Sequence, residues 1–386
     1  MTGGSFDTLG LKAPLLRATV AAGFEVPTPV QLAAIPAVLS GRDVLARAQT
    51  GSGKTAAFGL PLLQRISDGE DPPPPRGNHV FALVLVPTRE LAMQIDEVLS
   101  GLAEHLPTRT RVLAVYGGVS INPQMMALRG GVEILVATPG RLLDLCRNNA
   151  VRLSDTRVVV LDEADRMLSL GFAEELAEIR ALLPRERQTL LFSATFPSEL
   201  RTVIEATLRD PIEIELADEP LPEIEEHVYA VDEHKKSALI VQLLKEQKAQ
   251  RVLIFVSAKR SGDKLVEKLI RAGITAAVFH GDRSQAERTR CLADFRAGKL
   301  RVLIATDLAA RGIDIDDLPT VINFELPRSP NDYVHRIGRT GRAGKTGVAL
   351  TLICQAEQQH FRVIEKRIKR KLLRETVPGF EPEAWT

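Results

Sequence analysis

The stretch Ala48-Gln49-Thr50-Gly51-Ser52-Gly53-Lys54-Thr55 stands between a strand-like run at residues 43–46 and a helix-like run that begins at Ala56. Its two glycines let the backbone turn tightly and direct several N–H groups at one anion, and the following helix adds its positive N-terminal end. Lys54 is expected to neutralise the outer phosphates, and Thr55 to hold Mg²⁺. The stretch predicts a phosphate-binding loop. Because the general pattern opens with Gly where this chain has Ala48, a Gly-rich strand-to-helix turn is the alternative.

Short apolar runs rich in β-branched residues recur along the chain, and each ends in polar or glycine residues. Runs that are apolar throughout are typical of strands buried on both faces, and the helix-like segments between them indicate a parallel α/β sheet. Ligands of such sheets bind at the carboxyl ends of the strands. The runs are residues 80–86, 112–116, 132–137, 158–161 and 189–192 in the first half, and 251–256, 277–279, 302–305, 321–324 and 348–353 in the second.

The length of 386 residues exceeds what one hydrophobic core usually serves, so two domains are expected. Residues 210–226 are acidic and contain three prolines, which predicts a linker. We therefore expect a first domain at 1–209, a linker at 210–226, a second domain at 227–365 and a short basic tail at 366–386. Because only the first half has a phosphate loop, a nucleotide site completed across a cleft is expected.

The composition is nearly neutral, with a formal net charge of +1, so any contact with nucleic acid must depend on local clusters. One such cluster, at residues 366–374, fits a solvated helix face and a nucleic-acid contact equally well. Cys146, Cys291 and Cys354 lie far apart without histidines at metal spacing, which indicates reduced thiols. With no charged-then-apolar leader and no apolar run long enough to cross a bilayer, a cytoplasmic protein is expected.

The pair Asp162-Glu163 directly follows a buried strand-like run. A carboxylate there can reach Mg²⁺ held against phosphates while its neighbour polarises the attacking water, since phosphoryl transfer depends mainly on positioning and charge neutralisation. Acidic pairs at strand ends are common. The preceding phosphate loop makes the catalytic interpretation the favoured one.

Gln31 follows Pro27 and Pro29, which restrict the backbone and hold its side chain in place. An amide offers both a donor and an acceptor, as reading an adenine edge requires. By itself, a glutamine at this position is more typical of a helix N-terminus.

Ser329 and Pro330 are typical of an N-cap and first helical position, and the helix they begin would carry His335. Offsets of four and seven residues place Arg339 and Arg342 on the face of His335 if the helix continues through Gly338; otherwise Arg342 is presented from a loop. Guanidinium groups that face a γ-phosphate fit an arginine-finger role. The alternative is an ordinary basic surface helix.

Together these motifs resemble those of the DEAD-box RNA helicases, in the family's order, from about Phe6 to about Ile364. The resemblance implies two tandem RecA-like parallel-sheet domains of α/β class with the active site in the cleft between them. It also explains Ala48, which this family has in place of the first glycine. The matching stretches are the Gln motif at 23–31, Ala-x-Thr-Gly-Ser-Gly-Lys-Thr at 48–55, Pro-Thr-Arg-Glu-Leu-Ala at 87–92, Thr-Pro-Gly-Arg at 138–141, Asp-Glu-Ala-Asp at 162–165, Ser-Ala-Thr at 193–195, Ala-Arg-Gly-Ile-Asp at 310–314 and His-Arg-Ile-Gly-Arg-Thr-Gly-Arg at 335–342.

Carried over by position, the resemblance implies a set of site residues that bind ATP and Mg²⁺. Gln31 would read adenine, with Phe6 or Phe24 as the stacking ring, a choice the sequence leaves open. The phosphates would lie on Ala48, Gln49, Thr50, Gly51, Ser52, Gly53, Lys54 and Thr55, and the ribose on Asp314. Asp162 and Thr55 would hold the metal, Glu163 would act on the hydrolytic water, and Arg339 and Arg342 would close on the γ-phosphate.

The resemblance also implies RNA bound through its sugar-phosphate chain, independent of sequence, as a single strand or a short duplex. The implied contacts are Arg89, Gly118, Thr138 and Arg141 in the first domain, and Gln285, Arg288 and Thr306 in the second. Ser193, Thr195, Asp165 and His335 would couple the two halves.

Two local features qualify the match. The family more usually has a Tyr-Asp pair at 324–325, where this chain has Phe324-Glu325; Glu325 keeps the charge, so the interdomain contact is expected to survive. Residues 377–380 resemble the bacterial ribosome-associated members, which implies ribosomal RNA or RNA-processing complexes as partners.

The expected function is ATP-dependent local unwinding of short RNA duplexes in ribosome assembly or RNA remodelling. An ATP-gated RNA clamp or assembly factor is the alternative, because gripping and unwinding share one closed state. A DNA helicase is disfavoured by the Gln motif and Asp-Glu-Ala-Asp together.

Overall fold

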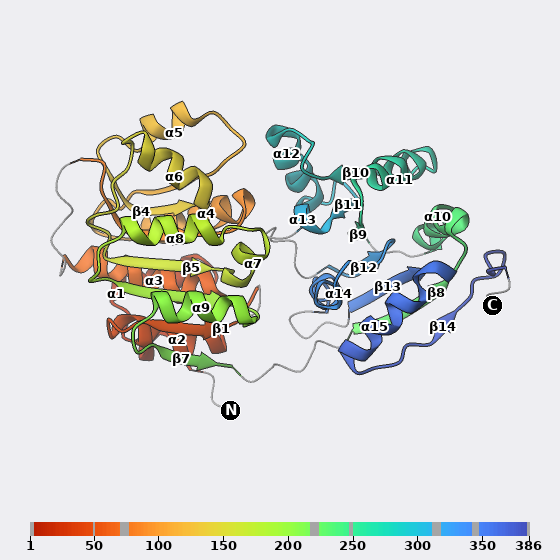
Figure 1. The fold of residues 1–386 in the computed structure, drawn as a ribbon, viewed down its shortest axis with the longest axis horizontal. Helices are drawn as coiled ribbons and strands as arrows, with labels where there is room; N and C mark the ends of the chain where they lie inside the picture. The colour runs from red at the N-terminus through yellow and green to blue at the C-terminus, as the bar shows by residue number, and fades with distance from the viewer. Residues whose placement is uncertain are drawn as a thin grey trace. The chain divides into compact units, whose positions relative to one another are not determined.

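The computed structural model describes residues 4–48, 51–69, 77–216, 224–246, 250–310, 318–341 and 347–383. The chain divides into two compact units, Met1–Ala217 and Asp218–Thr386. Each unit is built on one sheet of seven described strands with helices on both faces (Figure 1). The expected α/β class with two parallel sheets is confirmed.

The first sheet has the strand order β3-β4-β2-β5-β6-β1-β7, and all neighbouring strands pair in parallel. Its central strands are buried at every residue because helices cover both faces, which is why they appear in the sequence as continuous apolar runs. The strands are β1 (Val44–Arg47), β2 (Val80–Leu85), β3 (Val112–Val115), β4 (Val132–Ala137), β5 (Val158–Asp162), β6 (Gln188–Ser193) and β7 (Ile212–Glu215).

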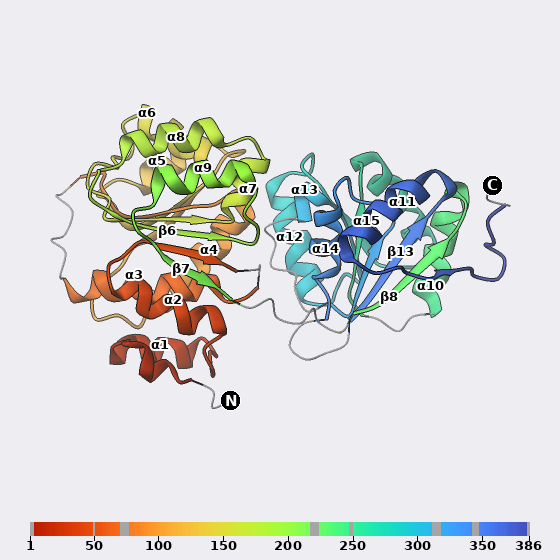
Figure 2. The same ribbon diagram turned by 60° about the horizontal axis from the view of Figure 1, so that its bottom comes forward.

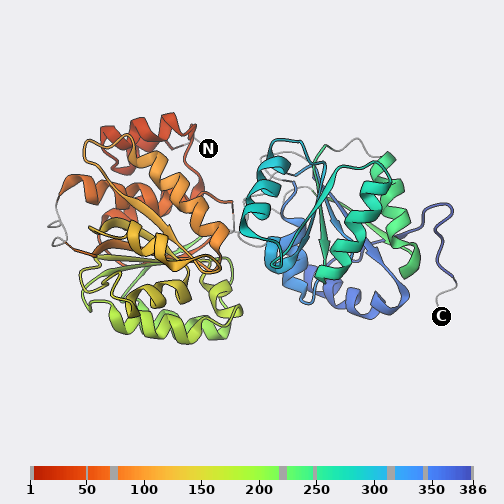
Figure 3. The same cartoon turned by 90° about the horizontal axis from the view of Figure 1, so that it is seen from above.

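Helices α1 to α4 form one apolar core with the first sheet, and helices α5 to α9 contribute to a second core on its other face. Figure 2 shows the two layers, and in Figure 3 the red to orange N-terminal helices and the yellow-green α8 and α9 lie on opposite sides of the strands. The helices are η1 (Phe6–Leu9), α1 (Ala13–Ala21), α2 (Pro29–Leu39), α3 (Lys54–Asp68), α4 (Arg89–Ala103), α5 (Ile121–Ala127), α6 (Pro139–Arg147), α7 (Ala164–Ser169), α8 (Ala173–Leu182) and α9 (Ser198–Thr207).

The second sheet has the order β10-β11-β9-β12-β13-β8-β14 and is also parallel. Helices α10 and α11 pack on one face, and α12 to α15 on the other. The strands are β8 (Ile224–Ala230), β9 (Val252–Val256), β10 (Ala276–Phe279), β11 (Val302–Thr306), β12 (Thr320–Asn323), β13 (Gly347–Ile353) and β14 (Arg374–Glu375). The helices are η2 (Glu233–Lys235), α10 (Lys236–Glu246), α11 (Lys259–Arg271), α12 (Gln285–Arg296), α13 (Asp307–Ala310), α14 (Pro330–Ile337), η3 (Gln355–Glu357) and α15 (Gln358–Ile368).

Residues 210–226, which the sequence predicts as a linker, include all of β7 and the first residues of β8, so that prediction is corrected at both ends. Strand β7 pairs with β1 at the edge of the first sheet, and β8 pairs with β13 in the second. Glutamates alternate with apolar residues in β7 and occur at two positions of β8, so a search for continuous apolar runs misses both strands. Residues 217–223 lie outside the described residues.

The basic stretch 366–386, expected to be a separate tail, is partly integrated into the second unit. Its first residues complete α15, and β14 pairs with β8 at the edge of the sheet. Both side chains of β14 contact neighbouring elements. Glu375 lies 2.8 Å from His227 on β8, and Arg374 pairs with Glu365 on α15 at 2.6 Å. Among the residues that the structure describes, no helix is both long and apolar enough to span a membrane.

Candidate functional site

Three of the predicted motifs lie at the carboxyl ends of the adjacent parallel strands β5, β6 and β1. Register places Asp162 opposite Phe192, and Ser193 opposite Arg47. The backbone N–H of Ala48, at the start of the phosphate loop, donates to the carbonyl of Ser193 at 3.0 Å. Parallel pairing therefore brings together residues that are more than 100 positions apart in sequence.

Gly53 is the N-cap of α3 and has a left-handed backbone, with φ of 89°. A Cβ atom there would lie 2.5 Å from Gln31 Nε2, so both the conformation and the close approach require glycine. The helix consequently begins at Lys54, two residues before the start expected from sequence. Lys54 Nζ lies 3.2 Å from Asp162 Oδ1, and both side chains are buried.

Burial alone lowers the pKa of Lys54, but the charges of Asp162 and Glu163 more than offset this effect, so its pKa is raised. Burial raises the pKa of Asp162, and Glu163 adds to the rise, whereas Lys54 opposes it. With Asp165 and Arg166 included, three carboxylates face two cations. Carboxylate oxygens are preferred ligands of a hard divalent cation, so these residues fit Mg²⁺.

Glu163 is one of four described non-glycine residues with a positive φ, at φ 54° and ψ 49°. Such a conformation costs about 1–3 kcal/mol, and it persists only where the surroundings hold it. Glu163 N–H donates to Asp162 Oδ1 at 2.9 Å, and Arg166 Nη1 donates to Glu163 Oε2 at 3.2 Å. These two hydrogen bonds hold the strained residue, and with it the carboxylate, at the start of α7. Arg166 was not predicted from the sequence, although its three-residue spacing from Glu163 could have indicated the contact.

Asp165, Ser193 and Thr195 form one hydrogen-bond network within the first unit. Asp165 Oδ2 accepts from the N–H and the hydroxyl of Thr195, at 3.1 and 2.5 Å. Ser193 Oγ accepts from the Asp165 N–H at 3.3 Å and donates to the Thr195 carbonyl at 2.7 Å. The network joins α7 to the segment after β6. The fourth predicted coupling residue, His335, is exposed on α14 of the second unit.

Gln31 occupies the N-terminal turn of α2, as its alternative interpretation predicts. Its side-chain oxygen accepts from the Thr28 N–H at 2.9 Å in a capping box, and its amide nitrogen donates to the Gly53 carbonyl at 3.1 Å. Thr28 Oγ1 donates to the Ser52 carbonyl at 2.7 Å. Both side chains therefore brace the phosphate loop. Thr28 was not predicted from the sequence, although Thr-x-x-Gln is a capping-box signal.

The two candidate stacking rings differ in exposure. Phe6 is 5% exposed and belongs to the core of the first unit, whereas Phe24 is half-buried at its margin. Phe24 is thus the more accessible ring.

The predicted RNA-contact residues of the first unit follow strands β2, β3 and β4, which lie side by side in the sheet. Arg89 begins α4 after β2, and a Cβ atom at Gly118 would lie 3.1 Å from Arg89 Nη1. Thr138 is the N-cap of α6 after β4. Arg141 is buried, and its Nη2 donates to the Val119 carbonyl at 2.7 Å, so it supports the loop beside Gly118. At the carboxyl ends of the strands, the phosphate-loop residues therefore lie beside β1, β5 and β6, and these RNA-contact candidates lie beside β2, β3 and β4.

In the second unit, the predicted RNA contacts follow the neighbouring strands β10 and β11. Gln285 begins α12, and Thr306 ends β11. Arg288 is buried, with its guanidinium carbon 4.6 Å from the centroid of the Phe279 ring. Four predicted site residues lie outside the described residues: Gln49, Thr50, Asp314 and Arg342.

Helix α14 begins at Pro330, with Ser329 as its N-cap, and ends at Ile337. It therefore does not continue through Gly338, and Arg339 follows the helix as a buried residue. Because the helix ends before Arg339, helical spacing no longer places Arg339 on the same face as His335.

Arg336, on the same helix, is held inside the second unit. It pairs with both oxygens of Asp307, at 2.6 and 2.7 Å, and donates to Asn323 Oδ1 at 3.0 Å. Its guanidinium also lies over the Phe255 ring. These contacts identify Arg336 as a structural residue.

Glu325 Oε2 accepts from the Ser257 N–H at 2.5 Å, so the residue that replaces the family's aspartate is bonded within its own unit.

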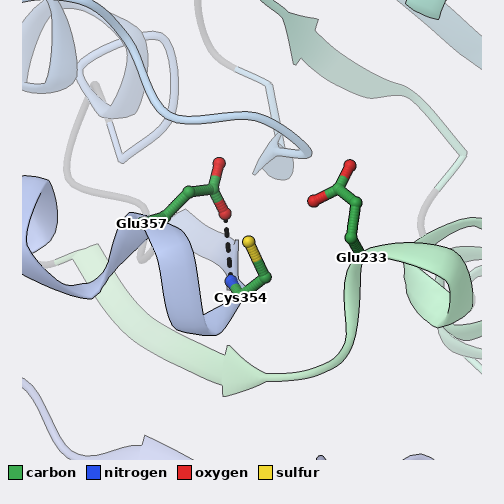
Figure 4. Close-up of side chains that lie close together, drawn as sticks. All are labelled: Glu233, Cys354 and Glu357. Carbon is green, nitrogen blue, oxygen red and sulfur yellow. Dashed lines mark hydrogen bonds between the residues drawn. The ribbon is translucent and has the colours of Figure 1, made fainter.

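Glu233, Cys354 and Glu357 bring three possible metal ligands within 4.8 Å of one another (Figure 4). The fully buried Lys236 already supplies a cation there, because its Nζ lies 2.6 Å from Glu357 and 3.2 Å from Glu233. Burial, with a contribution from Glu357, raises the pKa of Cys354 to about 11, which disfavours the thiolate a metal would need. The group is a structural ion-pair cluster.

Comparison with known proteins establishes the family. Residues 28–203 match the DEAD/DEAH box helicase family, and residues 235–344 match the helicase conserved C-terminal domain. Over 379 residues the chain is 42% identical to the DEAD-box ATP-dependent RNA helicase CshA of Bacillus subtilis (strain 168), covering 98% of this chain and 75% of that protein. The chain belongs to the DEAD-box ATP-dependent RNA helicases.

Solved structures agree with this assignment. S. cerevisiae Dbp5 bound to RNA and ADP BeF3 is similar with a TM-score of 0.83 and 32% identity, covering 96% of this chain and 95% of that chain. A DEAD box protein from Methanococcus jannaschii has a TM-score of 0.54 and 36% identity, with coverage of 96% and 98%. This DEAD-box helicase therefore has tandem RecA-like domains and is an RNA-dependent ATPase, as the sequence resemblance implies.

Proposed function

We propose that this DEAD-box helicase uses ATP binding to close its two units on RNA, and that closure separates short duplexes locally. The observation that carries the proposal is the division of the candidate chemistry between two units. Lys54, Asp162 and Glu163 lie in the first unit, and Arg339 lies in the second. Neither set alone surrounds a γ-phosphate.

In the proposed reaction each side chain has a separate task. Lys54 binds the outer phosphates, and Glu163 orients the attacking water and accepts its proton. Arg339 stabilises the charge that develops on the γ-phosphate. Asp162 and Thr55 are the residues that would hold Mg²⁺, which supplies charge neutralisation on the phosphate oxygens when bound.

RNA is proposed to lie along the strand ends of both units, on Arg89, Gly118 and Thr138 in the first and on Gln285 and Thr306 in the second. Small or neutral groups at several of these positions suit a ligand recognised by its sugar-phosphate chain. Arg141 and Arg288 are proposed to act by supporting these loops, because both are buried. Dbp5 bound to RNA and ADP BeF3, a structurally similar protein, supports a shared nucleotide and RNA mode. We further propose a cytoplasmic role in ribosome assembly or RNA remodelling.

Adenine selection is proposed to depend on Gln31, whose amide would exchange its bonds to Thr28 and Gly53 for the base, with Phe24 stacking. We expect Gln31→Ala to raise the Michaelis constant for ATP and to reduce the preference of the enzyme for ATP over GTP. The reason is that an unpaired hydrogen-bonding group costs about 1–3 kcal/mol. Steady-state ATPase and GTPase assays measure this ratio.

The matched control is Thr28→Val, which removes the hydroxyl of the same capping box and its bond to Ser52 but leaves the Gln31 amide in place. Thr28→Val should weaken the binding of ATP and of GTP equally. If Gln31→Ala behaves like Thr28→Val, Gln31 only braces the loop and adenine is read elsewhere.

Closure predicts thermodynamic coupling between ATP and RNA. A nonhydrolysable ATP analogue should tighten RNA binding by at least about fivefold, and RNA should tighten analogue binding by the same factor. RNA affinity should also fall with salt, because backbone contacts depend on charge. Fluorescence anisotropy of labelled RNA measures both effects.

A donor–acceptor dye pair on exposed positions, such as Glu104→Cys and Ala297→Cys, reports the interdomain distance in the same samples. Unchanged RNA affinity together with a fixed distance would contradict closure. Coupling without strand displacement in a duplex assay would instead favour an RNA clamp.

A further inference from the structure

A cavity of about 660 Å³ lies in the first unit between helices α7, α8 and α9 and strand β5. In Figure 1 strand β5 is visible between α8 and α9, and Figure 2 shows these two helices over the same face of the sheet. The walls of the cavity include Val159 and Leu161 from β5, Leu176 from α8 and Val203 from α9. The volume is in the range of small-molecule sites.

Small side chains at facing helix positions create this space. Ala173 and Ala177 on α8, and Thr202 and Ala206 on α9, all line the cavity. Residues four apart share one helix face, so each helix presents a small-residue strip to the cavity. The lining residue Leu168 consequently remains only half-buried. The apolar wall is therefore available to a ligand.

Two of the four charged side chains that line the cavity are arginines. Arg180 and Arg187 line it, and each donates to a backbone carbonyl, at 3.3 and 2.6 Å respectively. Neither forms an ion pair within the described ranges, and Arg187 Nε is buried there without a hydrogen-bond partner. Burial lowers the pKa of Arg187, and the charges of Arg209 and Arg180 lower it further against the opposing effect of Asp43. An anion would relieve this repulsion.

The acidic side chains that also line the cavity have other partners. Asp165 is bonded to Thr195, and exposed Glu199 accepts from Ser198 Oγ at 3.2 Å. Asp165 belongs to α7, whose N-cap is Glu163, and Leu168 near the other end of α7 lines the cavity too. A ligand here would therefore contact the helix that positions the candidate general base.

We propose that this cavity binds a small amphipathic anion, with its apolar body between α8 and α9 and its anionic head on Arg180 and Arg187. Occupancy changes the rate of ATP hydrolysis through α7. The site is separate from the phosphate loop, and ligand binding there is independent of the function proposed above.

Two fluorescent dyes test the ligand class on the full chain, with saturating ADP present to block the nucleotide site. Anilinonaphthalene sulfonate carries an aromatic body and one anionic head, and phenylnaphthylamine has the same aromatic groups without the sulfonate. The sulfonate is expected to bind at least about tenfold more tightly, which is the scale of one charge-assisted hydrogen bond. Equal affinities would overturn the proposed ligand class.

Two variants locate the site. Ala177→Phe fills the cavity and should abolish binding of both dyes. Arg187→Gln should lower only the affinity for the sulfonate dye, by about tenfold. The controls are Ala181→Phe on α8 and Arg185→Gln in the loop that follows, both at exposed positions outside the lining. Parent-like dye binding by Ala177→Phe, or an unchanged sulfonate affinity in Arg187→Gln, would overturn the site. Because Arg187→Gln leaves the apolar packing intact, it tests the proposal even if Ala177→Phe does not fold.

ATPase measurements at saturating RNA test the regulatory step. The sulfonate dye should change turnover by at least about twofold in the parent and leave Ala177→Phe unaffected. The same turnover change in both proteins, or none in the parent, would overturn control through this cavity.

Discussion

Glu163→Gln is expected to lower ATP turnover by roughly 10² or more while leaving ATP affinity nearly unchanged, because general acid–base groups contribute on this scale. The substitution keeps the shape of the side chain and an oxygen that can accept from Arg166. The strained backbone at φ 54° therefore keeps its support, and the lost property is the basicity of the carboxylate. Single-turnover hydrolysis beside equilibrium binding of a fluorescent ATP analogue separates the two effects.

The same variant is expected to retain RNA when ATP is bound, since the closed state would form and not be released by hydrolysis. Glu186→Gln, at an exposed position of the same unit, is the matched control and should behave as the parent. If Glu163→Gln turns over ATP at the parent rate, the assignment of Glu163 as the base is wrong.

Arg339→Ala is expected to reduce ATP hydrolysis by at least about 10³, which is the lower end of the contribution of an arginine finger. It should also remove most of the coupling between ATP and RNA, because Arg339 and Lys54 belong to different units. Arg339→Lys should recover only part of the rate, since lysine keeps the charge but loses the planar, bidentate donor set. ATPase assays and RNA affinity with the nonhydrolysable analogue measure these outcomes.

Arg336→Ala supplies the contrast, although both arginines are buried and stand only three residues apart. Removing Arg336 leaves Asp307 and Asn323 without their partner, and we expect a loss of about 3 kcal/mol in the free energy of unfolding of the second unit. Denaturant unfolding followed with both variants distinguishes the two roles. If Arg339→Ala loses activity only in proportion to its unfolded fraction, Arg339 is structural too and the finger assignment fails.

The amino-acid sequence by itself determined the central strands and the family. Residues 80–86 and 132–137 were recognisable as strands because parallel strands covered by helices on both faces are apolar throughout. The phosphate loop and Asp162-Glu163 were recognisable because phosphate binding restricts residue type over a short, contiguous stretch. Such local constraints leave a pattern that one sequence is sufficient to show.

Only the tertiary structure decided features that depend on what faces a residue. Strands β7, β8 and β14 are short or carry charged residues, so their pairing is not visible in apolar runs. Arg336 and Arg339 look alike in the sequence, yet Arg336 meets Asp307 from another strand end, a contact between residues 29 positions apart. The amide of Gln31 likewise reaches the Gly53 carbonyl, and Arg141 turns inward to Val119 instead of outward. Long-range hydrogen bonds and burial arise from chain topology, which residue type alone does not specify.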